Sequence, residues 1–305
     1  MKLLLDTDIG GDIDDAVALA YLLCQPRCAL LGVTTVGGQA ERRAALASAV
    51  CHAASRSDVP IHVGASQPLL VAERQTDAYQ GQALGPQWPH RTFAATNTAV
   101  EFLRDAIRAH PGAITLLAIG PLTNIGLLFA LDPEIPSLLQ QLMLVGGSPT
   151  AVTAEEEWNI LCDPHAAARV LASPLPITSV GCNVTARCHL PADECRRRFA
   201  AAGGPFDFVA AMAEVYFAAE TPEIFFHDPL AAALLFAPES CRTQPGRIEV
   251  EIYNPARLGR TRFNRADEQP PHHFAPHHLA PHHLAVEVDP PRFFEHLFTT
   301  IGATA

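Results

Sequence analysis

The chain is poor in three features: lysine, closely paired cysteines and long apolar runs. Lys2 is the only lysine among the 305 residues, which excludes enzyme classes that depend on a lysine late in the chain. The eight cysteines include no Cys-x-x-Cys pair, so we expect reduced thiols rather than a cysteine-built zinc site. No apolar run approaches the roughly 20 residues that a membrane-spanning helix requires.

The charge balance narrows the range of partners further. The formal net charge is −11, which argues against nucleic acid or an anionic membrane as the main partner. Hydrophobic residues make up 49% of the chain, enough to bury a large core, and we expect a single domain over residues 1–305. The first residues are too short an apolar stretch for a secretory signal, so we expect a cytoplasmic protein.

Five carboxylates are crowded into ten positions near the start of the chain. They are Asp6, Asp8, Asp12, Asp14 and Asp15, spaced around two glycines, with apolar runs on both sides. The pattern predicts a buried strand, a tight turn and a helix that begins at Asp14 or Asp15. A helix N-terminus supplies only about half a positive charge. We therefore predict a hard divalent cation, Ca²⁺ or Mg²⁺, with a solvated acidic helix cap as the alternative.

Buried strands alternate with helices along most of the chain. Strands are expected at residues 29–36, 59–63, 113–119, 142–145 and 176–180, with helices between them. This order predicts an α/β fold, with a doubly wound, Rossmann-like and mostly parallel sheet flanked by helices. Ligands in such sheets bind beyond the carboxyl ends of the strands, so the acidic stretch and the strand ends at residues 119 and 145 should meet there.

Residues 271–285 contain three copies of a five-residue pattern, Pro-His-His-x-Ala. The repeat holds six of the 14 histidines of the chain. It lies between the last two predicted strands, near 248–253 and 284–288. We interpret it as a passive His-rich loop, with binding of a transition metal as the alternative.

Several separated motifs together resemble one protein family. The motifs are Asp-Thr-Asp-Ile-Gly-Gly-Asp-Ile-Asp-Asp-Ala at 6–16, Gly-Val-Thr-Thr-Val at 32–36, Gly-Pro-Leu-Thr-Asn-Ile at 120–125, Val-Gly-Gly at 145–147, Glu-Glu-Trp-Asn at 156–159, Asp-Pro at 163–164 and His-Asp-Pro-Leu at 227–230. They resemble, in order and approximate spacing, the motifs of the inosine-uridine-preferring nucleoside hydrolases. The resemblance extends from residue 3 to about residue 300.

The resemblance implies a Ca²⁺-dependent enzyme that hydrolyses the N-glycosidic bond of a ribonucleoside to ribose and free base. Carried over residue by residue, the ion would be bound by Asp8, Asp15, the backbone carbonyl of Ile119, and Asp228. Asp8 would also act as the general base toward water. The family relation further implies a homodimer or a homotetramer.

The resemblance also assigns residues to the substrate. Those expected to bind it are Asp14, Gln39, Glu157, Trp158 and Asn159. His227 resembles the residue that helps the base to leave, and its position before Asp228 favours this role over that of a structural histidine. An imidazole suits this role because it titrates near neutrality.

The acidic motif departs from the family pattern. Ile9 stands where proline is usual, and two residues are inserted in the turn. Asp12 therefore competes with Asp14 and Asp15 for the metal and ribose roles, and we keep it as a further candidate metal ligand.

Other departures leave two rival hypotheses to consider. Gln39 replaces the usual asparagine, Gln80 stands where many members have histidine, and residues 148–154 lack the family's Gly-Asn pair. These changes favour, as the alternative, a non-catalytic member that binds a ligand without turnover. A haloacid-dehalogenase phosphatase also begins with an Asp-x-Asp motif, but it needs a later lysine that this chain lacks. The base preference, purine or pyrimidine, is not determined by the sequence.

Overall fold

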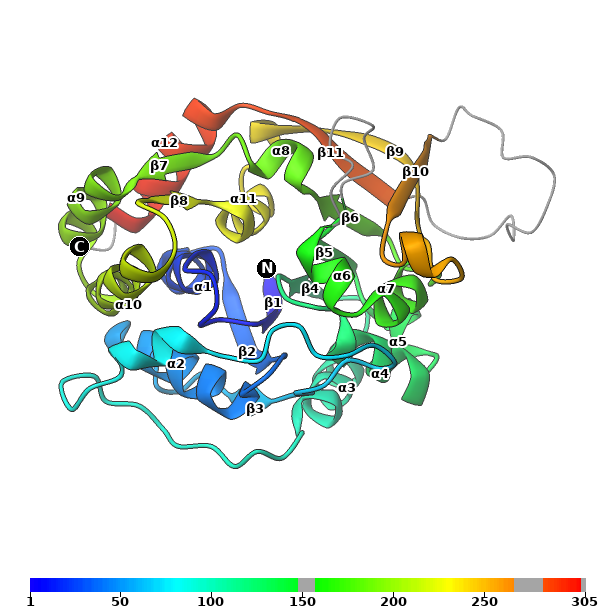
Figure 1. The fold of residues 1–305 in the computed structure, drawn as a ribbon, viewed down its shortest axis with the longest axis horizontal. Coiled ribbons are helices and arrows are strands. Elements are labelled where there is room, and N and C mark those ends of the chain that lie inside the picture. Colours follow the sequence, from blue (N-terminus) through cyan, green and yellow to red (C-terminus); the bar gives the residue numbers. More distant parts are fainter. Residues whose placement is uncertain (148–156, 266–281, 303–305) are drawn as a thin grey trace.

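A nine-stranded sheet forms the centre of the protein (Figure 1). The computed structural model describes residues 1–147, 157–265 and 282–302. In sheet order the strands are β3 (Ile61–Val63), β2 (Ala29–Thr35), β1 (Lys2–Thr7), β4 (Ile114–Ala118), β5 (Gln141–Val145), β6 (Ile177–Val180), β11 (His282–Val288), β9 (Cys241–Val250) and β10 (Thr261–Arg265).

Most of the sheet is parallel. The seven strands from β3 to β11 run parallel to their neighbours, whereas β9 is antiparallel to β11 and β10 is antiparallel to β9. The first six strands follow the order 3-2-1-4-5-6 of a doubly wound fold, whose topological switch point lies between β1 and β4. The predicted fold class is confirmed. The acidic stretch follows the end of β1 and therefore lies at this switch point.

Helices cover both faces of the sheet (Figure 1). One face carries α1 (Asp14–Cys24), α2 (Ala40–Ala53), α9 (Ala192–Ala202), α10 (Pro205–Ala219), α11 (His227–Leu234) and α12 (Pro290–Gly302). The other carries α3 (Ala99–Ala109), α4 (Thr123–Leu131), α5 (Ile135–Leu138) and α7 (Pro164–Leu171). Shorter elements are α6 (Trp158–Cys162), α8 (Cys182–Thr185), the 3₁₀ turns η1 (Tyr79–Ala83), η2 (Pro238–Ser240) and η3 (Pro255–Arg257), and a small sheet of β7 (His189–Pro191) with β8 (Glu223–Phe225).

The alternation of side chains along β1 divides the interior into two hydrophobic cores. Leu3 and Leu5 point into the core beneath α1, and Leu4 points into the opposite core. Each buried leucine of this kind stabilises the fold by about 1.5–3 kcal/mol. Helix α1 is apolar on nearly all sides because α2, α10, α11 and α12 pack around it. Its first turn, and the carboxylates in it, consequently lie inside the protein.

The His-rich repeat requires a correction at its C-terminal end. Residues 282–285 of its third copy begin strand β11 and do not lie in a loop. Leu284 and Ala285 are buried and the strand pairs with both β6 and β9, so core packing outweighs the loop-like composition. Residues 271–281 lie outside the described ranges. Sequence patterns also missed α9, β10 and the small β7–β8 sheet.

Two expectations from composition can be compared with the described ranges. All eight cysteines lie within them and are present as thiols rather than disulfides. Among the helices of these ranges, none has both the length and the apolar character needed to cross a bilayer.

Candidate active site

A cavity of about 520 Å³ opens beyond the carboxyl ends of β1, β4 and β5. One part of its lining, which we term the strand-end wall, comprises Asp8, Asp14, Asp15, Ile119, Glu157, Asn159, His227 and Asp228. Another part, the loop wall, comprises Arg74, Gln75, Asp77 and Tyr79 from the segment before and within η1, and Tyr216 and Glu220 from the end of α10. Asp12 and Trp158 also line the cavity.

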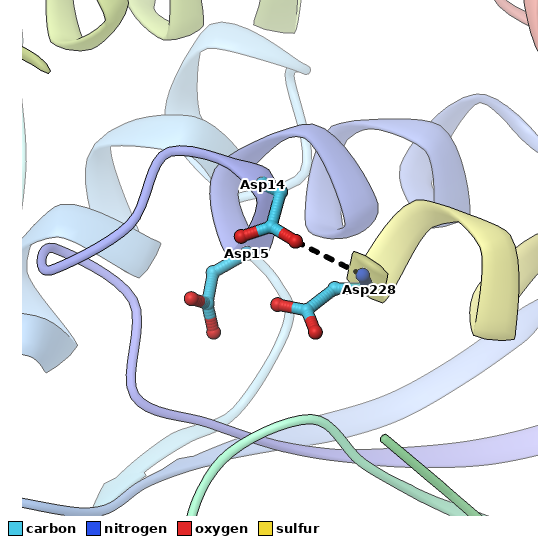
Figure 2. A group of neighbouring side chains, drawn as sticks. All are labelled: Asp14, Asp15 and Asp228. Carbon is cyan, nitrogen blue, oxygen red and sulfur yellow. Dashed lines mark hydrogen bonds between the residues drawn. The ribbon is translucent and has the colours of Figure 1, made fainter. Parts of the chain in front are cut away.

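Three carboxylates of the strand-end wall converge (Figure 2). Oxygen atoms of Asp14, Asp15 and Asp228 all lie within 4.8 Å of one another. Asp14 and Asp15 are in the first turn of α1, and Asp228 is in the first turn of α11. The backbone N–H of Asp228 donates to Oδ2 of Asp14 at 3.0 Å, which fixes one helix start against the other. We refer to these residues as the acidic triad.

Asp8 lies beside the acidic triad and outside its closest grouping. Its carboxylate lines the cavity, and Gly120 lets the end of β4 approach it, because a Cβ there would lie 2.8 Å from Asp8 Oδ1. The Thr7 hydroxyl donates to the Asp15 carboxylate and accepts from the backbone N–H of Ile9. These two hydrogen bonds orient the Asp15 carboxylate. Asp14 thus joins the tightest group, although the sequence had assigned it to the ribose.

A buried arginine organises the acidic turn. Arg43 is fully buried, and its guanidinium donates to the carbonyls of Asp8, Ile9 at 3.2 Å, and Gly38 at 2.9 Å. Gly10 allows the sharp turn with a φ of +111°, where a side chain would also collide with Leu46. An arginine keeps its charge in proteins, so it places one positive charge behind the carboxylates.

Burial dominates the electrostatics of the carboxyl groups. It raises the pKa of Asp8, and it raises the pKa values of Asp14, Asp15 and Asp228 well above their usual range, with repulsion among the carboxylates adding to the effect. The charge of Arg43 and a hydrogen bond from Gln75 oppose this rise at Asp8. A divalent cation placed among these oxygens would favour their ionised form.

Glu157 and Asn159 form the adjoining part of the strand-end wall. The Glu157 carboxylate caps α6 by accepting from the N–H groups of Asn159 at 3.1 Å and Ile160 at 3.0 Å, and burial raises its pKa to about 7. The Asn159 side-chain N–H₂ donates to the carbonyl of Ile119 at 2.9 Å and to that of Val145 at 3.2 Å. These bonds fix the carbonyl that was predicted to be a metal ligand.

His227 lies at the start of α11, half-buried in the cavity lining. Its Nδ1 is 2.6 Å from the hydroxyl of Thr185. Burial lowers the pKa of His227 to about 4, so the imidazole is neutral at pH 7. Trp158 is 49% exposed at the rim of the cavity.

Comparison with known proteins identifies the family of the chain. A family model described as inosine-uridine preferring nucleoside hydrolase matches residues 3–295. The chain belongs to this family. Family membership makes it a nucleoside hydrolase, an enzyme acting on N-glycosyl bonds.

Relatives of the nucleoside hydrolase span nearly the whole chain. Uridine nucleosidase 1 of Arabidopsis thaliana is 31% identical, covering 82% of this chain and 78% of that protein. A pyrimidine-specific ribonucleoside hydrolase, RihA, of Klebsiella pneumoniae is 32% identical, covering 82% and 84%. Among solved structures, the purine-preferring ribonucleoside hydrolase from Gardnerella vaginalis superposes with a TM-score of 0.84 at 26% identity, covering 99% and 98%.

Two residues that depart from the family motifs, Gln80 and Gln39, make structural hydrogen bonds, and Gln80 bonds to the acidic turn itself. Gln80 donates from its backbone N–H to the carbonyl of Gly10 at 3.1 Å and from its side chain to that of Gly11 at 2.9 Å. The side-chain oxygen of Gln39 accepts from the N–H of Ala78 at 3.2 Å. Within the described cavity lining Gln39 is absent, so the structure does not bring it together with the other predicted substrate residues. Residues 148–154, which lack the Gly-Asn pair, lie outside the described ranges.

The sequence indicated neither Arg43 nor Thr185. For the loop wall it indicated the loop segments 64–95 and 206–226, but none of the individual residues. The one available signal for Arg43 was a charged residue on the otherwise apolar face formed by residues 40, 44 and 47. The lack of helical or strand periodicity in residues 73–79 indicates a loop but does not show which of its side chains line the cavity.

Proposed function

We propose that this nucleoside hydrolase cleaves the N-glycosidic bond of a ribonucleoside to ribose and free base, with a Ca²⁺ ion held at the acidic triad and Asp8 as the general base. The observation that supports this most strongly is the convergence of the buried triad, Asp8 and the Ile119 carbonyl on one cavity. The proposed metal ligands are Asp8, Asp15, Asp228 and the Ile119 carbonyl, with oxygens of Asp14 and Asp12 close by.

The donor set fits a hard cation. All of the candidate ligands are oxygens, which favour Ca²⁺ or Mg²⁺ over zinc. Asp8, Asp14, Asp15 and Asp228 are each at most 4% exposed, and Arg43 supplies the single buried positive charge donating into this turn within the described ranges. A bound Ca²⁺ would neutralise these carboxylates, bind ribose hydroxyls and lower the pKa of a water molecule modestly.

Asp8 is placed to take a proton from the attacking water. Cleavage of a glycosidic bond passes through an oxocarbenium-like state, so the sugar gains positive charge as the C1′–N bond lengthens. The Asp8 carboxylate lines the cavity beside the acidic triad and would be ionised next to the cation, so it can accept that proton. The neighbouring carboxylates stabilise the positive charge that develops on the sugar.

Ribose is the part of the substrate that the strand-end wall would hold. Asn159 uses its N–H₂ group on two backbone carbonyls, so its amide oxygen remains to accept from a ribose hydroxyl. Glu157 and Asp14, which also line the cavity, offer further carboxylate acceptors. Trp158 at the rim would cover the sugar from the solvent side.

The leaving base would lie toward His227 and the loop wall. A neutral imidazole can donate one N–H to the departing base while its other nitrogen is engaged by Thr185. The relatives include proteins named for uridine, for pyrimidines and for purines, so their names do not select one base. We propose a ribonucleoside substrate whose base is selected by the loop wall.

The alternative, ligand binding without turnover, drew its support from Gln39, Gln80 and the missing Gly-Asn pair. Gln39 and Gln80 both make hydrogen bonds that hold the longer acidic turn and its neighbouring segment. Gln80 thus has a structural role in the turn and Gln39 one beside η1, and the missing Gly-Asn pair lies outside the described ranges. We favour turnover over this alternative because the candidate ligands converge on one cavity.

An activity panel tests the proposal. Purified protein would be incubated with purine and pyrimidine ribonucleosides, with and without a chelator, and released reducing sugar measured. We expect release that the chelator abolishes and that Asp8→Ala nearly eliminates. No release from any nucleoside at high protein concentration would contradict the hydrolase assignment to nucleosides, and release that survives both chelation and Asp8→Ala would contradict the mechanism.

A further inference from the structure

A buried hydroxyl lies behind His227, in the segment that follows β6. Gly181 precedes the short helix α8 and Thr185 ends it, with the Thr185 side chain fully buried. The side-chain N–H₂ of Asn183 donates to the carbonyl of Ala285 at 2.7 Å and so ties α8 to strand β11. The hydroxyl of Thr185 is thereby held at a fixed place beside the cavity.

The contact between Thr185 and His227 specifies a proton position. Thr185 Oγ1 lies 2.6 Å from His227 Nδ1, and a hydroxyl has one proton to donate. If that proton goes to Nδ1, the neutral ring carries its own proton on Nε2. In the opposite tautomer the hydroxyl would need another acceptor, and among the described residues its one hydrogen bond is to His227.

Aromatic packing fixes the plane of the imidazole. His227 stacks on Phe225 with 5.8 Å between ring centroids and an interplanar angle of 18°. Phe225 in turn stacks on His189 at 5.1 Å, and His189 pairs with Glu223 at 2.9 Å. With its plane and its Nδ1 both held, the ring has only its Nε2 edge left to offer the cavity.

We propose that Thr185 is a positioning residue that donates to Nδ1 of His227 and keeps the Nε2–H directed to the departing base. This inference rests on the proposed hydrolysis and on the role of His227 in it. As the C1′–N bond breaks, its electron pair passes to the base, which accepts a hydrogen bond from Nε2–H. Water adds its oxygen to C1′ and gives a proton to Asp8. The base then takes up a proton from solvent water, and Asp8 releases its proton to solvent, so that no net proton is gained or lost.

Substrates with different leaving groups test this role. Nucleosides need help at the base, whereas 4-nitrophenyl β-D-ribofuranoside releases nitrophenolate, which is stable as an anion. In the calcium-loaded protein, we expect Thr185→Val to lower kcat for uridine and inosine roughly 10- to 100-fold while changing kcat for the nitrophenyl riboside less than about threefold. Thr185→Ser should restore activity on nucleosides. Thr115→Val, at a buried threonine of β4 outside the cavity lining, is the matched control.

A double variant and a spectroscopic measurement separate positioning from a general structural role. Because Thr185 acts through His227, adding Thr185→Val to His227→Ala should cause no further loss on nucleosides. The ¹⁵N shifts of His227 should show the Nε2–H tautomer in the wild type and a mixture in Thr185→Val. Equal losses on both substrate types, multiplying effects in the double variant, or an Nδ1–H tautomer in the wild type would overturn the proposal. A wild-type protein that hydrolyses neither substrate would contradict the proposed function instead, and the tautomer measurement would still decide the Thr185–His227 bond.

Discussion

The two walls of the cavity differ in how they are built. The strand-end wall comes from strand ends and helix starts, with its oxygens fixed by backbone and side-chain hydrogen bonds. The loop wall comes from an irregular segment and the last turns of α10. In the proposed function, the strand-end wall serves the reaction common to all nucleosides and the loop wall contacts the base. Substitutions in the strand-end wall should therefore lower kcat/KM for all nucleosides alike, whereas substitutions in the loop wall should change the preference among bases.

The largest effect is expected for the acidic triad. Asp228→Asn removes a charge that both the cation and the developing positive sugar require, without changing side-chain volume. We expect kcat/KM to fall by about 10³-fold or more for every nucleoside alike. Steady-state kinetics on uridine and inosine measure this, with Asp207→Asn, an exposed carboxylate in the first turn of α10, as the control. A loss confined to one nucleoside would break the distinction between the walls.

Arg43 joins the walls, since it also donates to the carbonyls of Gln75 at 3.4 Å and Asp77 at 3.5 Å. Arg43→Leu leaves several buried carbonyls without donors and removes the charge behind Asp8. We expect the free energy of unfolding to fall by about 3–5 kcal/mol, as measured by urea denaturation, with kcat reduced for all substrates. Arg43→Lys should have a free energy of unfolding and a kcat between those of Arg43→Leu and the wild type. Wild-type kcat in the leucine variant would show that the turn does not depend on this arginine.

The loop wall should change preference more than rate. Tyr216 is 5% exposed and lines the cavity, so its hydroxyl is available to a base. We expect Tyr216→Phe to shift the ratio of kcat/KM for uridine over inosine by about tenfold, the effect of losing one substrate hydrogen bond. If both values fall by the same factor, Tyr216 belongs functionally with the strand-end wall.

The smallest effect on catalysis is expected outside both walls, at His282. Burial and the charge of Arg247 lower the pKa of His282 to about 4, below the usual 6.5 of the unfolded chain. As the pH falls, His282 is protonated in the unfolded chain before it is protonated in the folded protein. The free energy of unfolding therefore decreases as the pH falls from 6.5 toward 4. His282→Asn retains an acceptor for the N–H of Ile248 but does not titrate.

Urea denaturation at two pH values measures this contribution. Between pH 7.5 and pH 5 the wild type should lose about 2 kcal/mol more stability than His282→Asn. At pH 7.5 both proteins should have the same kcat. The same loss of stability in both proteins would show that His282 does not titrate in this way.

More residues of the strand-end wall than of the loop wall could be predicted from the sequence. Asp8, Asp14 and Asp15 could be found from the sequence because the strand and helix pattern places them at the end of a buried strand, whereas Asp228 was found through the family resemblance. Their grouping could not, and Asp14 entered the triad because the Asp228 N–H binds its carboxylate.

The hydrogen bonds made by Gln39 and Gln80 near the acidic turn could not be predicted from the sequence either. Gln39 and Gln80 were recognised as departures, but only the coordinates show them bound to Ala78 and to the Gly10–Gly11 backbone. Long-range hydrogen bonds of this kind have no periodic signature. The strands up to β6 could be located from the sequence, whereas β10 and the true start of β11 depend on antiparallel pairing at the sheet edge.

Calcium titration by calorimetry on chelator-stripped protein tests the central claim most directly. We expect one Ca²⁺ bound per chain in the wild type, loss of that binding in Asp15→Asn, and wild-type binding in Asp207→Asn. Absence of Ca²⁺ binding to the wild type, or unchanged binding to Asp15→Asn, would contradict it.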